Sequence, residues 1–321
     1  MKLLIRTRPS GRRTHACALL VVAAMLCMPQ GASAQYERPG STDAQFLKIG
    51  VSARAAGMGE AYIASVTGAE SAHYNAANLG YMEGTDLVFN HTRWFAGISH
   101  DFFSVAHQFG LGALAVSVTA LSTNEMAVRT PLQPEGTGET FYATNLRAGL
   151  TYARRLTDRV SLGGTVNFIS MGLYDDYSQR AIAVDVAASY VSDFQGFRFG
   201  MKIANLGSEV TYINESYPLP INFTFGLAMD AVNAADHRVI VSGSAQKPND
   251  GKPLGNVGAE YGFRGLFFLR GGYQINYGTA SYTFGTGLNL DIRSNEFRFD
   301  YGYSAFGDLG VAHRFAIGLH L

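Results

Sequence analysis

From about residue 86 to its last residue, the chain alternates between apolar and polar side chains with a period of two. In residues 296–304, one face carries only aromatic rings and the other carries mainly charges. The aromatic face consists of Phe297, Phe299, Tyr301 and Tyr303, and the opposite face of Glu296, Arg298, Asp300 and Ser304. Because successive side chains of a strand point to opposite sides, the pattern predicts strands with one apolar and one charged face.

The first 34 residues have the features of a cleavable signal peptide. Five basic residues precede an apolar stretch at 16–28, and Ala-Ser-Ala at 32–34 forms a cleavage site. The apolar stretch is too short to cross a bilayer as a stable helix. Both cysteines, Cys17 and Cys27, lie in this leader, so the exported chain has no thiol for a disulfide or a metal.

The leader decides which way the strand faces are turned. An exported chain with about a dozen alternating strands and no cysteine is typical of an outer-membrane β-barrel, whose apolar face contacts lipid. The fold class predicted is therefore an all-β transmembrane protein located in the outer membrane. Without the leader, 25 basic residues become 20 against 25 acidic ones, which argues against nucleic acid as a partner.

The exported chain divides into two regions. Residues 35–84 are helix-prone and rich in small side chains, and residues 85–321 read as strands and turns. Fourteen strands are predicted, which is an even number, as in bacterial barrels of one chain. Their bounds are 86–94, 98–108, 112–122, 142–155, 158–171, 179–192, 196–206, 221–232, 237–247, 254–263, 266–276, 281–292, 296–304 and 311–321.

The lengths of the connections support this count. If the chain enters the barrel from the periplasm, every second connection lies outside the cell. All the long ones, above all 123–141 and 207–220, then fall outside, and the inner turns are tight, as the barrel class requires.

The alternation also predicts which charged side chains face the lumen. They carry both signs, which favours a lumen crossed by ion pairs or filled by a plug over a wide ion-selective pore. They are Asp185, Arg198, Lys202, Asp230, Glu260, Arg270, Asp291, Glu296, Arg298, Asp300 and Arg314.

Three motifs of the N-terminal region resemble the opening of the PorV/PorQ family, a branch of the FadL-type fourteen-stranded barrels. They are Phe46–Gly50, Ala53–Ala61 and Ser71–Leu79. The family usually has Asn-Pro-Ala where this chain has Asn75-Ala76-Ala77. The resemblance implies that the N-terminal segment folds into the barrel as a small helical hatch. The hatch residues expected to matter are Arg54, Gly57, Gly59, Glu60, Asn75, Ala76 and Ala77. A pair of periplasmic helices outside the barrel is the alternative.

The resemblance also implies a function. Members serve the type IX secretion system by binding the C-terminal signal domain of cargo and carrying it from the translocon barrel to the attachment complex. The partners expected are the translocon, the cargo domains and membrane lipid, with no cofactor. The external loops offer aromatic and flexible apolar side chains, which are frequent at interfaces. The candidates are Met126, Val128, Leu132, Tyr212, Ile213 and Tyr217.

Two other functions remain open from the sequence. A FadL-like transporter of hydrophobic molecules needs a kinked wall, which the glycine pairs Gly163-Gly164 and Gly271-Gly272 could mark. An outer-membrane hydrolase needs paired acids near a histidine, for which Asp175-Asp176 and His100-Asp101 are candidates. No sequence pattern for a serine hydrolase, a zinc protease or a calcium loop is present. A non-enzymatic barrel is therefore predicted.

Overall fold

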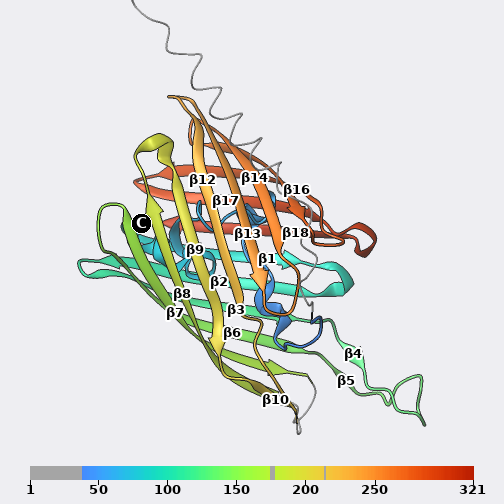
Figure 1. Ribbon diagram of the computed structural model, residues 1–321. Coiled ribbons are helices and arrows are strands. Elements are labelled where there is room, and N and C mark those ends of the chain that lie inside the picture. Colours follow the sequence, from blue (N-terminus) through green and yellow to red (C-terminus); the bar gives the residue numbers. More distant parts are fainter. Residues whose placement is uncertain (1–37, 174–177, 213–214) are drawn as a thin grey trace, which may run out of the picture. The chain divides into compact units, whose positions relative to one another are not determined.

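The computed structural model describes residues 38–173, 178–212 and 215–321. In this part of the chain, fourteen strands form one closed barrel in which all neighbours are antiparallel (Figure 1). The barrel strands are β1 (Thr85–Arg93), β2 (Ser99–Phe109), β3 (Gly112–Ser122), β6 (Thr144–Arg155), β7 (Val160–Gly172), β8 (Ser178–Val191), β9 (Arg198–Gly207), β12 (Asn222–Asn233), β13 (His237–Pro248), β14 (Leu254–Phe263), β15 (Phe267–Ile275), β16 (Tyr282–Ile292), β17 (Asn295–Ala305) and β18 (Val311–His320).

The predicted fold class is confirmed, and each strand end lies within two residues of its predicted position. Consecutive barrel strands pair with each other, and β1 pairs with β18 to close the barrel. Asp86 lies opposite His320 in this closing pair, and Arg93 lies opposite His313. None of the helices in the described part of the chain is long and apolar enough to cross a membrane.

The faces of the strands are reversed relative to a soluble protein. In β7, Leu162, Val166 and Phe168 are exposed on the outer wall. The intervening Thr165 and Asn167 are buried in the lumen. Apolar side chains on the outside are stable only where the surroundings are lipid, so this arrangement suits a barrel in a membrane.

The two ends of the barrel differ. One end, here called the long-loop end, carries two hairpins that extend beyond the wall (Figure 1). One hairpin consists of β4 (Met126–Ala127) and β5 (Thr140–Phe141), and the other of β10 (Val210–Tyr212) and β11 (Glu215–Tyr217). The opposite end, here called the short-turn end, has only tight turns and the 3-10 turn η5 (Phe194–Gly196). Two more 3-10 turns, η4 (Phe95–Gly97) and η6 (Gly307–Leu309), lie in loops of the long-loop end.

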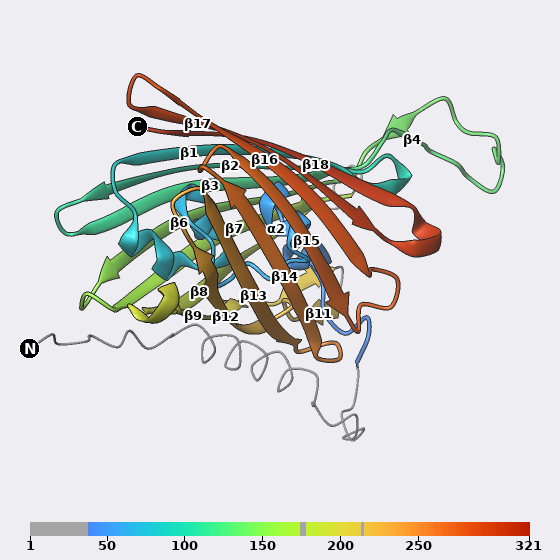
Figure 2. The ribbon, with the colours of Figure 1, turned by 90° about the horizontal axis from the view of Figure 1, so that it is seen from above.

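Residues 38–84 lie inside the barrel, where Figure 2 shows their short helices enclosed by the wall. These helices are η1 (Gln45–Lys48), α2 (Ala53–Gly57), η2 (Gly68–Glu70), α3 (Ser71–Tyr74) and η3 (Ala76–Tyr81). This segment is called the hatch below. Its apolar side chains pack together and against the wall, and Leu79 of η3 belongs to the same buried cluster as Phe102 of β2. The core of the molecule is therefore the space between hatch and wall. The predicted signal peptide, residues 1–34, lies outside the described residues.

Candidate functional site

The hatch backbone lies very close to the wall at several glycines. A Cβ atom on Gly272 of β15 would lie 2.2 Å from the backbone nitrogen of Gly59. A Cβ atom on Gly57 would lie 2.9 Å from the Cα of Gly285 in β16. Gly59 also has a φ of +64°, which favours glycine. Two of the predicted hatch glycines therefore lie at points where only glycine allows the approach.

The same kind of contact anchors the second half of the hatch. A Cβ atom on Gly163 of β7 would lie 2.5 Å from the carbonyl carbon of Ala76. The side-chain oxygen of Asn75 accepts a hydrogen bond from the Ala77 N–H at 3.2 Å, and its amide donates to the Ile63 carbonyl at 3.1 Å. Ala76 is the first residue of η3, a position that proline favours. With alanine at this position, the chain forms η3 without a proline.

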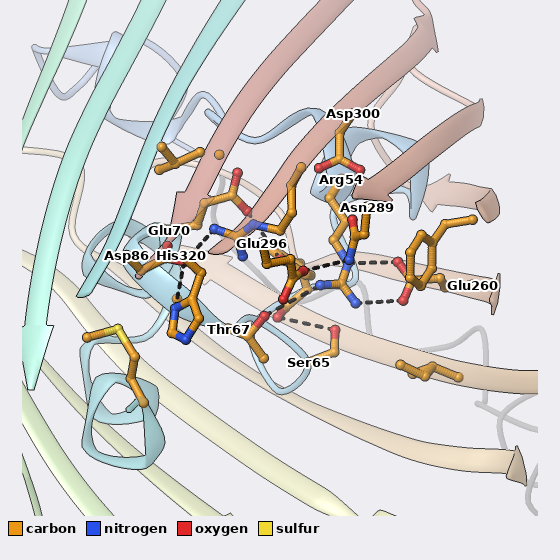
Figure 3. Close-up of a pocket in the computed structure, with 18 of the residues that line it drawn as sticks. Arg54, Ser65, Thr67, Glu70, Asp86, Glu260, Asn289, Glu296, Asp300 and His320 are labelled. Carbon is orange, nitrogen blue, oxygen red and sulfur yellow. Dashed lines mark hydrogen bonds and ion pairs between the residues drawn. The ribbon is translucent and has the colours of Figure 1, made fainter. Parts of the chain in front are cut away.

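An ion-pair chain joins the hatch to the wall (Figure 3). Arg54 in α2 donates two hydrogen bonds to the Glu260 carboxylate, at 2.7 and 2.6 Å. Arg270 donates to the same carboxylate at 2.6 Å and to Asp300 at 2.5 Å. Glu260 is 2 % exposed, so one buried carboxylate holds a hatch guanidinium and a wall guanidinium together. Such paired hydrogen bonds are among the stronger ones in proteins.

A second ion pair joins the hatch to β18. Glu60 accepts hydrogen bonds from Arg314 of β18 and, at 3.1 Å, from the Tyr74 hydroxyl. That hydroxyl in turn accepts from the backbone N–H groups of Val51 and Ser52. Glu60 therefore connects the wall to two separate turns of the hatch.

A polar chamber of about 330 Å³ lies between the hatch and the short-turn end (Figure 3). The five arginine side chains that line it are all paired with carboxylates. Arg298 donates to Asp86 at 2.5 Å, and Asp230 accepts from both Arg198, at 2.7 Å, and Arg238. Three further carboxylates of the chamber, Glu70, Glu83 and Glu296, form no ion pair with another described residue.

The remaining residues predicted in the lumen take different places. Asp185 accepts from Arg147 at 3.0 Å, and Lys202 donates to the His73 carbonyl at 2.5 Å. Glu296 accepts from the Asn289 amide at 2.7 Å, whereas Asp291 is exposed at the end of its strand. Sequence reasoning missed Arg147, although it lies on the charged face of β6 and the alternation could have identified it.

At the long-loop end, the start of the hatch is bound to the turn after β13. The buried Asp250 carboxylate accepts from the Thr42 hydroxyl at 2.6 Å, the Gln45 amide at 2.9 Å and Lys48 at 2.9 Å. Burial raises the pKa of Asp250, but these three donors outweigh it and lower the pKa to about 2. The group of Thr42, Gln45, Lys48 and Asp250 is called the latch below.

An apolar cavity of about 600 Å³ lies beside the latch, at the base of the β4–β5 hairpin. Its walls come from the hatch start and from the long-loop ends of β3, β6 and β7. The apolar members are Ala44, Phe46, Ile49, Leu121, Ala143, Met171 and Leu173, and the polar ones are Asp43, Gln45 and Asn145. This cavity was not predicted from the sequence, because its walls come from four separate segments.

The two hairpins expected to contact partners differ in exposure. On the β4–β5 hairpin, Leu132 is 93 % exposed and Met126 is exposed, while Val128 is half-buried. The β10–β11 hairpin lies against the hatch, since Val210 and Leu219 beside it are buried with Phe46. On this hairpin Tyr217 is half-buried and bonded to Glu215, Tyr212 ends β10, and Ile213 lies outside the described residues.

The residues considered for catalysis do not come together in the described structure. His100 is buried in the lumen, whereas Asp101 lies on the outer wall and bonds to His91 at 2.6 Å. The other pair, Asp175-Asp176, lies outside the described residues. The glycine pairs considered for a wall opening keep regular pairing on both sides of β7 and β15.

Comparisons with known proteins agree with this geometry. A family model described as type IX secretion system protein PorV matches residues 32–248. Among solved structures, the toluene transporter TbuX of Ralstonia pickettii has a TM-score of 0.53 at 14 % identity, and the toluene transporter TodX of Pseudomonas putida 0.56 at 10 %. A FadL homologue of Pseudomonas aeruginosa has a TM-score of 0.54 at 7 % identity. Each comparison covers 84 % of this chain and 97 % of the other. At these identities the structures share the fold alone. No curated protein matches the sequence.

Proposed function

Because the chain belongs to the PorV family of type IX secretion system proteins, we propose that it binds the C-terminal signal domains of exported cargo at the cell surface. The resemblance read from residues 46–79 is thereby confirmed, and the chain is an outer-membrane barrel of this type. The family and the fold neighbours indicate a non-enzymatic barrel. The observation that carries the proposal is the family match, which spans the hatch and the wall through β13.

The internal structure supports binding at one end over passage through the lumen. The hatch fills the barrel with close backbone contacts, and two sets of ion pairs fix it to the wall. A folded cargo domain has no path past these contacts. Partner binding in this proposal therefore takes place at the long-loop end, which faces the cell exterior.

The β4–β5 hairpin has the chemistry that this role requires. It extends from the barrel and exposes Leu132 and Met126, apolar side chains that bury well against a partner. The hairpin is a two-stranded ribbon, which is marginally stable alone and is stabilised by additional contacts. The giant translocon barrel delivers cargo to this surface, and the attachment complex receives it.

Replacing residues 124–142 with a short Gly-Ser turn tests the proposal. Thr123 and Ala143 at the base of the hairpin are joined by a backbone hydrogen bond of 3.1 Å, so a tight turn closes the gap without moving β3 or β6. In cells that lack the native chain, this variant is expected to leave cargo unattached to the surface. The measurement is the amount of cargo on the cell surface and in the medium.

The control replaces the exposed turn at Arg264 and Gly265, on the short-turn end, with a different two-residue turn. It is expected to support normal attachment. Normal cargo attachment by the hairpin variant would contradict the proposed binding surface. Deletion of 207–220 is less informative, because that loop packs on the hatch through Val210 and Leu219.

Transport of hydrophobic small molecules is a second candidate. The apolar cavity at the long-loop end favours it, since cavities of about 300–1,000 Å³ hold small ligands. The charged, plugged lumen below that cavity disfavours it. Uptake of labelled toluene by cells with and without the chain separates the two candidates.

A further inference from the structure

The apolar cavity beside the latch has one charged wall. Asp43 lines it, and the carboxylate uses Oδ1 to accept a hydrogen bond from the Ala44 N–H at 2.7 Å. The second oxygen, Oδ2, is buried and accepts no hydrogen bond from any residue in the described part of the chain. No ion pair to Asp43 is formed within that part either. The cavity therefore combines apolar walls with a carboxylate that no cation of the described residues neutralises.

The neighbouring cation does not supply the missing charge. Lys48 lies in the same hatch turn, but its ammonium group is 2.9 Å from Asp250. Asp250 is 4 % exposed and also accepts from Thr42 and Gln45, so Lys48 is held in the latch. A positively charged group from outside the chain is thus the natural partner of Asp43.

The hairpin above the cavity carries the same sign of charge. Residues 123–143 contain the acids Glu125, Glu135 and Glu139 against the single base Arg129. All four are exposed. Approaching ligands with positive charge are attracted to this end, and those with negative charge are repelled.

We propose that the cavity between the hatch start and the β4–β5 hairpin binds a peptide segment of the secreted cargo, with one apolar side chain inside and an adjacent basic side chain on Asp43. This inference rests on the proposed function and names the chemistry of the partner. A peptide fits better than a small hydrocarbon for two reasons. The uncompensated carboxylate needs a cation, and the exposed apolar hairpin beside the cavity extends the surface beyond the size of a small molecule.

The position of the cavity couples binding to the hatch. Ala44 and Phe46 form part of the wall and belong to the turn that carries the latch. A segment bound in the cavity therefore touches the hatch directly, without entering the lumen.

The test uses the full exported chain in lipid nanodiscs and two labelled peptides. One is N-acetyl-Phe-Leu-Lys-amide and the other is N-acetyl-Phe-Leu-norleucine-amide, which has the same apolar stem without the charge. Fluorescence anisotropy measures both affinities. The lysine peptide is expected to bind about tenfold more tightly, because a hydrogen bond to a charged group is among the stronger ones.

Three variants assign the effect to the cavity. Asp43→Asn keeps the side-chain shape and is expected to abolish the preference for lysine. Ala143→Trp fills the cavity and is expected to weaken both peptides. Asn145→Phe does the same from β6, since Asn145 lines the cavity and lies on the same face of its strand as the buried Arg147. Asp308→Asn, an exposed acid on another loop of the same end, is the matched control and is expected to change nothing.

Equal affinity of the wild type for the two peptides overturns the proposal, as does unchanged binding in both cavity-filling variants. Binding of labelled toluene in place of either peptide would also overturn it and assign the cavity to a small molecule. Fluorescence of the single tryptophan, Trp94, checks that each variant is folded. The peptide assay needs no secretion system, so the hairpin replacement described above can fail independently. A lysine preference with normal cargo attachment in that variant contradicts the β4–β5 hairpin as the binding surface and leaves the cavity proposal standing.

Discussion

Single carboxylates determine how the hatch is held in the barrel. Glu260 binds Arg54 of the hatch and Arg270 of the wall, and all three side chains are largely removed from water. Burying charged side chains costs desolvation free energy, and the attraction between the paired charges offsets about that cost. These ion pairs therefore define the position of the hatch more than they stabilise the folded chain. Removing either partner leaves a buried charge, so the hatch has one preferred position.

Asp250 gives the first testable consequence. Its folded pKa of about 2 lies below the usual value of an aspartate, so the latch contributes stability above a pH of about 4 and loses it as the pH falls towards 2. The measurement is amide hydrogen exchange of residues 42–48, corrected for the intrinsic rate. These amides are expected to be equally protected from pH 7 to about 4 and to lose this protection at lower pH. In Asp250→Asn the protection is expected to be low throughout.

Asp308→Asn is the matched control for the latch, because Asp308 is exposed on the same end. It is expected to leave the exchange of residues 42–48 unchanged at every pH. Full protection of these amides in Asp250→Asn would show that the three donors hold the turn without the carboxylate charge.

Among the elements, the strands of the wall are shaped to the hatch by glycine. Gly271 and Gly272 are neighbours in β15, so side chains at these two positions would point to opposite faces of the wall. A Cβ atom on Gly272 would lie 2.2 Å from the hatch backbone, whereas one on Gly271 would have nothing within 4 Å. The pair that could mark a kinked wall opening thus includes one residue that makes room for the hatch.

Gly272→Ala is therefore expected to displace the hatch and to destabilise the folded chain by about 1–3 kcal/mol, the usual cost of overpacking. Gly271→Ala places the same methyl group on the outer wall and is expected to be nearly neutral. Urea unfolding followed by Trp94 fluorescence measures both. Equal midpoints for the two variants would mean that the backbone contact at Gly59 contributes nothing.

At the scale of the whole molecule, the reversed barrel predicts the effect of charge on its wall. Val166 lies near the middle of β7 and is 54 % exposed on the outer face. Val166→Arg is expected to cost about 2–4 kcal/mol of folding free energy in a bilayer, as arginine does near the midplane. The measurement is the unfolding midpoint in lipid vesicles.

Leu132→Arg is the control for this change, because Leu132 is 93 % exposed at the tip of the β4–β5 hairpin, outside the wall. It is expected to leave the midpoint unchanged. A harmless arginine at position 166 would place the outer wall in water and contradict the membrane barrel.

Much of the barrel wall could be predicted from the sequence, because side-chain alternation is a local property. A period of two identifies a strand and its two faces from its own residues, and so the strand ends lie within two residues of their predicted places. Arg270, Glu260 and Asp300 were placed in the lumen by the same argument. The alternation could not predict that these side chains form connected ion pairs with Arg54, since the residues lie far apart in the sequence.

The sequence by itself determined the number of strands, the reversed faces and the family, since short-range patterns and short motifs carry each of them. Only the tertiary structure decided which wall glycines the hatch touches, how each lumen charge is paired, and that an apolar cavity with an uncompensated Asp43 opens beside the latch. These features depend on barrel closure, which brings together residues separated by as many as 254 positions, as in the Glu60–Arg314 pair. No local pattern encodes such a contact.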